Sequence, residues 1–168
     1  MDNTRDTFLS SRAVVKGNEV SYFNKKASTA KRADGTTGWF GAVSKTTDGG
    51  KTWTQVFLSG LENDSFYFNG IACSSDTNCV VVGEGDDANG SISVAFSTFD
   101  GGATWQKTIA GTDASMMGVD FVSETEGWVA ATQMAGRGLN AVFYHTVDGG
   151  KTFSIDEVFA SHFFIIFV

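Results

Sequence analysis

The chain contains the octapeptide Thr46-Thr-Asp48-Gly-Gly-Lys-Thr52-Trp53 and repeats this pattern twice. The second copy is Thr98-Phe-Asp100-Gly-Gly-Ala-Thr104-Trp105, and the third is Thr146-Val-Asp148-Gly-Gly-Lys-Thr152-Phe153. Their aspartates lie 52 and then 48 residues apart, and self-similarity at such a period is typical of stacked repeats such as propeller blades. We refer to the three segments as octets 1, 2 and 3.

Each octet predicts a tight turn between two strands. The aspartate can accept hydrogen bonds from nearby backbone N–H groups, and the two glycines that follow can adopt the positive φ that tight hairpins need. Strand-forming residues precede the octets at 40–44, 92–96 and 141–144, and each octet ends in a threonine and an aromatic residue. The sequence therefore predicts an all-β fold.

The shared pattern Ser/Thr-x-Asp-x-Gly-x-Thr-Trp resembles the Asp-box, or BNR, repeat of sialidase-like β-propellers. The chain is most similar to the photosystem II stability/assembly factor family, and more distantly to sortilin-type and sialidase- or xyloglucanase-type propellers. The resemblance covers residues 38–168, whereas residues 1–37 carry no recognisable motif. The matching positions are Thr46, Asp48, Gly50, Thr52 and Trp53; Thr98, Asp100, Gly102, Thr104 and Trp105; and Thr146, Asp148, Gly150, Thr152 and Phe153.

A propeller blade is a four-stranded antiparallel meander, and the sequence can be divided accordingly. One blade is predicted to use strands at 68–73, 79–83, 91–98 and 104–109. The next is predicted to use strands at 117–121, 127–131, 139–146 and 152–158. Residues 8–37 have room for two inner strands of a first blade, at 13–15 and 19–23. We therefore expect about three blades, with residues 1–37 as an N-terminal segment and residues 38–168 carrying the octets.

The ends of the chain do not match a closed ring. By the spacing from each octet to the next inner strand, residues 163–168 are either the first strand of another blade or unrelated sequence after a break. Propellers typically close with four to eight blades. We therefore expect either a fragment of a larger propeller or a protomer that completes the ring by self-association.

Charge is distributed unevenly along the chain, whose net charge is −7. Residues 1–34 hold 7 Lys and Arg against 4 Asp and Glu, while residues 35–168 hold 5 against 15. An acidic repeat body argues against binding of nucleic acid, and no apolar run is long enough to span a membrane. Lys31 and Arg32, with Lys25 and Lys26 before them, form a basic cluster that is either a docking patch or an ordinary solvated loop.

The two cysteines are predicted to form a disulfide. Cys73 and Cys79 flank a short connection between the first and second strands of one blade, where they would face each other. A disulfide favours an extracellular or organelle-lumenal compartment, and the alternative is a pair of buried thiols. Two sulfurs with only His145 and His162 elsewhere do not suggest a metal site.

The blade layout separates two faces of the propeller. The octets join third to fourth strands and the cysteine hairpin joins first to second, so both lie on one face. We expect Asp48, Asp100 and Asp148 to be structural. The resemblance implies that ligands meet the opposite face, formed by the connections at 24–38, 58–67, 83–91, 110–117 and 132–139.

Two groups on that opposite face are candidates for binding. Asp86, Asp87 and Asn89 gather oxygen atoms, but their spacing does not match an EF-hand, so we expect an acidic turn and no metal. Arg137 is the only arginine of the repeat body and is the best candidate for a bidentate contact to a carboxylate. A turn arginine without a partner is the alternative.

The sequence contains no recognisable catalytic constellation. A sialidase needs a cluster of arginines, and a glycosidase needs two carboxylates facing each other across a cleft. The acidic residues on the binding face show no distinguishing spacing. We expect a non-enzymatic scaffold without a cofactor that binds a protein partner, with carbohydrate as a second ligand class. The alternative is part of a glycoside hydrolase or of a sortilin-like receptor propeller.

Overall fold

The protein is built from antiparallel β-strands. The computed structural model describes residues 7–16, 19–31, 37–59, 65–87, 90–111, 114–135 and 138–157. These residues form twelve strands and no helix. The predicted all-β fold is confirmed.

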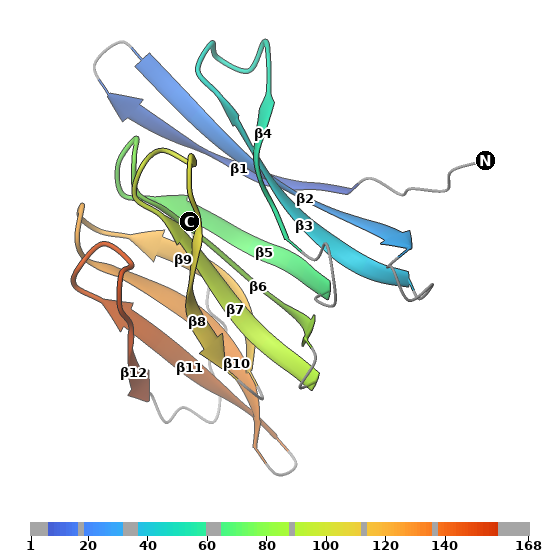
Figure 1. The fold of residues 1–168 in the computed structure, drawn as a ribbon. Coiled ribbons are helices and arrows are strands. Elements are labelled where there is room, and N and C mark those ends of the chain that lie inside the picture. The colour runs from blue at the N-terminus through green and yellow to red at the C-terminus, as the bar shows by residue number, and fades with distance from the viewer. Residues whose placement is uncertain are drawn as a thin grey trace.

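The strands form three four-stranded sheets, which we call blades 1, 2 and 3, each joined in simple sequence order. Every adjacent pair of strands is antiparallel, and Figure 1 shows the sheets side by side. Blade 1 contains β1 (Thr7–Lys16), β2 (Glu19–Lys31), β3 (Thr37–Thr46) and β4 (Thr54–Leu58); blade 2 contains β5 (Ser65–Cys73), β6 (Cys79–Asp87), β7 (Gly90–Thr98) and β8 (Gln106–Gly111); blade 3 contains β9 (Ala114–Phe121), β10 (Gly127–Ala135), β11 (Gly138–Thr146) and β12 (Ser154–Glu157).

Several strands are longer than the sequence predicted. The expected connection at 24–38 is mostly strand, because β2 pairs with β3 as far as Lys31 opposite Thr37. Lys25 and Lys26 therefore lie within β2 and not in a loop. The expected turn at 83–91 is also too long, because Asp86 and Asp87 belong to β6. Antiparallel strands can pair until only a two-residue turn remains, whatever the polarity of their ends. The strand expected at 163–168 lies outside the described residues.

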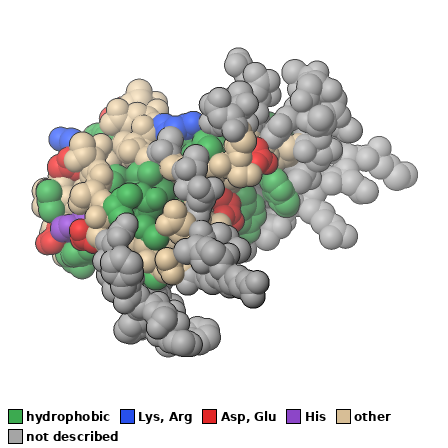
Figure 2. Space-filling model, turned by 90° about the horizontal axis from the view of Figure 1, so that it is seen from below, with side chains coloured by type: hydrophobic (Ala, Val, Ile, Leu, Met, Phe, Trp, Pro, Cys, Tyr) green, Lys and Arg blue, Asp and Glu red, His purple; other side chains and the backbone are tan. Residues whose placement is uncertain are grey.

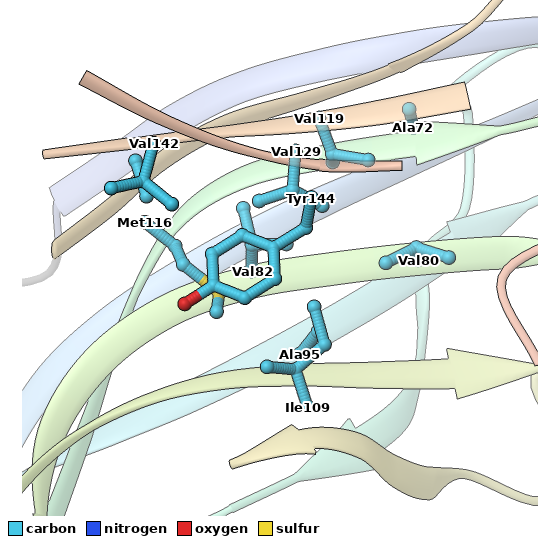
Figure 3. Close-up of a cluster of buried hydrophobic side chains, with 11 residues drawn as sticks. Ala72, Val80, Val82, Ala95, Ile109, Met116, Val119, Val129, Val142 and Tyr144 are labelled. Atoms are coloured by element: carbon cyan, nitrogen blue, oxygen red, sulfur yellow. The ribbon is translucent and has the colours of Figure 1, made fainter. Parts of the chain in front are cut away.

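The core lies in two layers, one on each side of blade 2. Val80 and Val82 of β6 pack toward blade 3, while Val81 between them packs toward blade 1. All three valines have no exposed surface. Figure 3 shows the layer shared with blade 3, where Met116, Val119, Val129, Val142 and Tyr144 meet the β6 valines. Successive side chains of β6 point to opposite sides of blade 2 and are buried on both. They therefore join the three blades into one body.

The disulfide between Cys73 and Cys79 is confirmed. The two residues are direct partners across β5 and β6. Their bond closes the hairpin between these strands on the same side of the blade as the octet turns.

The first strands of blades 2 and 3 cross at two glycines. A Cβ atom on Gly70 of β5 would lie 2.9 Å from the Cα of Gly118 in β9 and 3.3 Å from the backbone N of Val119. Backbone atoms cannot move aside as a side chain can. Glycine at position 70 therefore allows the two inner strands to approach each other.

We predict that Gly70→Ala destabilises the fold by about 1–3 kcal/mol through overpacking. Gly111→Ala is the matched control, because its Cβ would meet only the Tyr144 hydroxyl, at an ordinary 3.5 Å. Urea denaturation of the two variants and the wild type measures the effect. Equal stability of the two variants would contradict the close approach.

We predict that replacing both cysteines by serine lowers the free energy of unfolding by about 2 kcal/mol at most, because the closed loop is short. Thermal unfolding of the double variant and of the wild type, with and without reductant, measures this. Reductant should lower the melting temperature of the wild type only. A wild type indifferent to reductant would contradict a stabilising disulfide.

Candidate binding face

In each octet, the aspartate carboxylate accepts hydrogen bonds from other residues of the same turn. In octet 1 the Thr46 hydroxyl donates to Asp48 Oδ1 (2.7 Å) and accepts from the Gly50 N–H (3.0 Å). The Thr52 hydroxyl donates to Asp48 Oδ2 (2.6 Å), and the Thr52 N–H donates to Oδ1 (3.0 Å). The same bonds recur in octets 2 and 3. Both glycines of every octet have positive φ, between 72° and 94°.

These bonds hold the three carboxylates in the ionised form. The hydrogen bond from the Thr104 hydroxyl, helped by those from the Thr104 N–H and from Thr98, lowers the pKa of Asp100 to about 2. Burial raises the pKa of Asp148, but bonds from Thr152 and Thr146 outweigh it and bring the pKa to about 2. The Thr52 hydroxyl likewise lowers the pKa of Asp48. Both oxygens of each carboxylate therefore accept hydrogen bonds from the turn itself.

Each of the later octets is also fixed to its own blade. The Gly101 N–H donates to the carbonyl of Thr77 (2.9 Å), and the Gly149 N–H donates to the carbonyl of Thr125 (2.8 Å). Thr77 lies in the cysteine hairpin. The octets and the hairpins between first and second strands therefore share one face, as predicted. In Figure 1 the octet turns lie along one side of the sheets, and the far ends of β2, β6 and β10 lie along the other.

On the other side, the junction of blades 1 and 2 presents an aromatic pair. Trp39 of β3 is 46% exposed, and its ring meets that of Tyr67 of β5 edge to face, with centroids 5.5 Å apart. The backbone N–H of Trp39 donates to the hydroxyl of Ser65 (2.7 Å). The backbone of Trp39 is thus fixed by Ser65 and its ring contacts Tyr67, while much of the side chain meets solvent.

Polar groups lie beside this pair. Glu84 pairs with Tyr67 across β5 and β6, and its Oε1 accepts from the Asn69 amide (3.4 Å). The same amide donates to the carbonyl of Met116 in blade 3 (3.0 Å). Asp86 Oδ1 accepts from the Ser91 hydroxyl (2.8 Å) across the β6–β7 hairpin. An acidic rim therefore lies next to the aromatic pair.

The inner strands share a local irregularity. The pairing register of β5 shifts between Phe68 and Gly70 and leaves Asn69 without a partner. The equivalent shift in β9 leaves Met117 unpaired, and that in β1 leaves Ser10 unpaired. Bulges redirect a side chain away from the regular alternation. The bulge at Asn69 brings its amide to both Glu84 and the next blade.

The predicted binding residues are only partly placed by the structure. Asp86 lies on the acidic rim, Asp87 ends β6 and Lys31 ends β2. Arg32, Asn89 and Arg137 lie outside the described residues. Sequence reasoning missed Trp39, Tyr67, Asn69 and Glu84. The one available signal in the sequence was Trp39, a large aromatic residue close to the start of β3, where the strand begins at this face.

Neither a metal-binding cluster nor a membrane-spanning helix is found among the described residues. They include no group of three or more His, Cys, Asp or Glu side chains that could hold a metal ion. Within the same part of the chain, no helix is long and apolar enough to cross a bilayer.

We predict that Asp148→Ala lowers stability by about 1 kcal/mol, as expected for loss of a side chain that caps several backbone N–H groups. Asp48→Ala should lower it less, because octet 1 is exposed whereas Gly149 and Gly150 of octet 3 are buried. Thermal unfolding ranks the two variants. The reverse order would contradict a larger structural role for octet 3.

The lowered pKa values also predict a pH dependence. The carboxylates of Asp100 and Asp148 have a lower pKa in the folded state than their ordinary value of 3.8. Their ionised forms therefore stabilise the fold fully above pH 3.8, and this stabilisation is lost as the pH falls toward about 2. The melting temperature of the wild type should therefore fall across that window. Asp148→Ala should show a shallower fall, and an identical pH profile would count against the assignment.

The comparisons with known proteins support the fold alone. No family model matches the sequence, and no curated protein matches it. Among solved structures, the chain is similar to a polysaccharide lyase, an ulvan lyase bound to a -[GlcA(1-4)Rha3S]- saccharide, with a TM-score of 0.51 and 11% sequence identity. The match covers 92% of this chain, which spans 35% of that lyase. At this identity, the likeness extends to the arrangement of the strands.

Proposed function

We propose that this chain is a non-enzymatic protein-binding scaffold whose partner contacts the face opposite the octets. The observation that carries the proposal is the half-exposed Trp39, fixed by Ser65 and Tyr67 on that face. Tryptophan and tyrosine are enriched among the residues that dominate binding energy at protein interfaces. A side chain that is already held in place loses little entropy when a partner covers it.

The charge around this anchor favours a basic partner. Glu84 and Asp86 border the aromatic pair, and the repeat body has a strong excess of acidic residues. Complementary charge steers association and selects among partners. We propose Asp86, Asp87 and Asn89 as contacts to lysine or arginine of the partner, and Arg137, Lys31 and Arg32 as contacts to its carboxylates.

The octets support an assignment to the Asp-box class of propellers. Their aspartates serve the turn and leave binding to the other face, in line with the resemblance to photosystem II stability/assembly factors. Within this proposal the chain acts in an oxidising extracellular or organelle-lumenal compartment, where the Cys73–Cys79 disulfide is stable.

A carbohydrate-active role is the second candidate, because the similar solved structure is a polysaccharide lyase bound to a saccharide. This likeness concerns the fold, and the same fold can serve unrelated functions. Glu84, on the acidic rim, is the carboxylate that we would test for such a role. Product release from uronate polysaccharides that is lost in Glu84→Gln would favour the enzyme over the scaffold.

The scaffold is tested with arrays of lysine- and arginine-rich peptides and matched glutamate-rich peptides. We expect selective binding of the basic set, weakened about tenfold or more by Trp39→Ala, in the range of an interface hot spot. Trp53→Ala is the matched control, because Trp53 is an exposed tryptophan, 42% accessible, on the octet face. Binding that is unchanged in Trp39→Ala, or lost equally in both variants, would overturn the proposal.

A further inference from the structure

The junctions between blades share one device. The residue that precedes an octet donates a hydrogen bond to a glycine carbonyl of the next octet along the chain. Lys45 Nζ of blade 1 donates to the carbonyl of Gly101, the first glycine of octet 2 (3.1 Å), and Ser97 Oγ of blade 2 donates to the carbonyl of Gly150, the second glycine of octet 3 (2.8 Å). Octets 2 and 3 thus each bind the preceding blade as well as their own.

The second glycine of the octet fits closely into that preceding blade. A Cβ atom on Gly102 would lie 3.1 Å from Val56 Cγ2, and one on Gly150 would lie 2.6 Å from Val80 Cγ2. The aromatic residue of octet 2 packs against the same preceding blade as its glycines. Trp105 stacks on Phe57 of blade 1 with ring centroids 5.1 Å apart. We call the glycine pair with its aromatic the plug, and the surface that receives it on the preceding blade the socket.

The plug of octet 1 has no such neighbour among the described residues. A Cβ atom on Gly49 would meet nothing within 4 Å, and one on Gly50 would meet only the octet's own Trp53, at 3.9 Å. Trp53 is correspondingly more exposed than Trp105 or Phe153. Octet 1 therefore has the geometry of a plug without a socket.

Blade 3 carries the matching socket. His145 precedes octet 3 as Lys45 and Ser97 precede octets 1 and 2. It pairs with Trp128 across β10 and β11, as Ser97 pairs with Val80 across β6 and β7. The His145 and Trp128 rings stack with centroids 4.6 Å apart and an interplanar angle of 8°. A pair of stacked rings thus stands where the blade 2 socket has Ser97 and Val80.

Acidic side chains surround this second socket. His145 Nε2 lies 3.3 Å from Glu126 Oε1, and Nδ1 lies 3.5 Å from Asp156 Oδ2. Figure 2 shows histidine and acidic side chains together at one edge of the molecule. Val147 of octet 3, two residues after His145, is 67% exposed. The equivalent residue of octet 2 is Phe99, and its ring is covered by Lys151 of octet 3. Lys51 of octet 1 is the complementary charge for such a socket.

We propose that a second copy of this chain inserts its octet 1 into the socket formed by Trp128 and His145 on blade 3. The glycines of octet 1 pack against the Trp128 and His145 rings, and Glu126 and Asp156, which both contact His145, face Lys51 of the other copy. The contact is head to tail, so two copies that satisfy each other close a ring. Six blades lie within the range in which propellers close. This association uses the edges of the blade stack and is independent of the proposed binding face.

The test is the mass of the whole 168-residue chain in solution, by sedimentation velocity over a range of concentrations. We expect about twice the chain mass of 17.9 kDa. Gly50→Asn should block the plug, because its side chain has room in the single copy and none in a socket. His145→Ala should weaken the socket. Each should raise the dissociation constant about tenfold or more.

Gly90→Asn is the matched control, since Gly90 is another positive-φ glycine with nothing near its Cβ position, on the opposite face. It should remain dimeric, and thermal unfolding should show that all variants are folded. A mixture of Gly50→Asn and His145→Ala should recover dimers through its one intact junction. A monomeric wild type, or a Gly50→Asn variant as dimeric as the wild type, would overturn the proposal.

Discussion

The bond between one aspartate and its own turn underlies the architecture. In each octet the carboxylate accepts N–H and O–H donors from residues two to four positions away, and this fixes both glycines at positive φ. The fixed turn presents a glycine carbonyl and an aromatic ring to the blade before it. A local interaction of eight residues therefore sets the contact between blades that are about 50 residues apart in sequence.

What could be predicted from the sequence is what local chemistry decides. The octet turns, the cysteine hairpin and the strand at 79–83 depend on residues close together in the chain, and each was predicted. The ends of β2 and β6 were placed wrongly because their polar composition is typical of loops, whereas pairing with β3 and β7 keeps them extended. The Trp39–Tyr67 contact joins residues 28 positions apart through the packing of two blades, and the Asn69 bulge depends on a register shift. Only the position of Trp39 near the start of its strand gave a signal in the sequence, and the bulge had none.

The two faces of the blades meet different physical demands. On the octet face, the aspartate of each octet accepts hydrogen bonds from the donors of its own turn, and glycines permit close approach between neighbouring elements. On the opposite face, strands continue beyond the core to short turns, so their last residues carry polar and aromatic side chains without disturbing the packing. The residues that stabilise the core and the residues of the proposed binding face therefore lie at different places along each strand. The core valines of β6 are fully buried, away from the strand ends.

This separation is visible when equivalent positions are compared between blades. At the octets the three blades use the same residue types, because each turn must satisfy the same donors. The positions equivalent to Trp39 hold Ser91 and Leu139, and the unpaired Asn69 corresponds to Met117. A contact that recurs in every blade cannot distinguish one partner from another, whereas an asymmetric set of side chains can. The repeated residues therefore build the fold, and under the proposed function the specificity for a partner would come from the positions at which the blades differ.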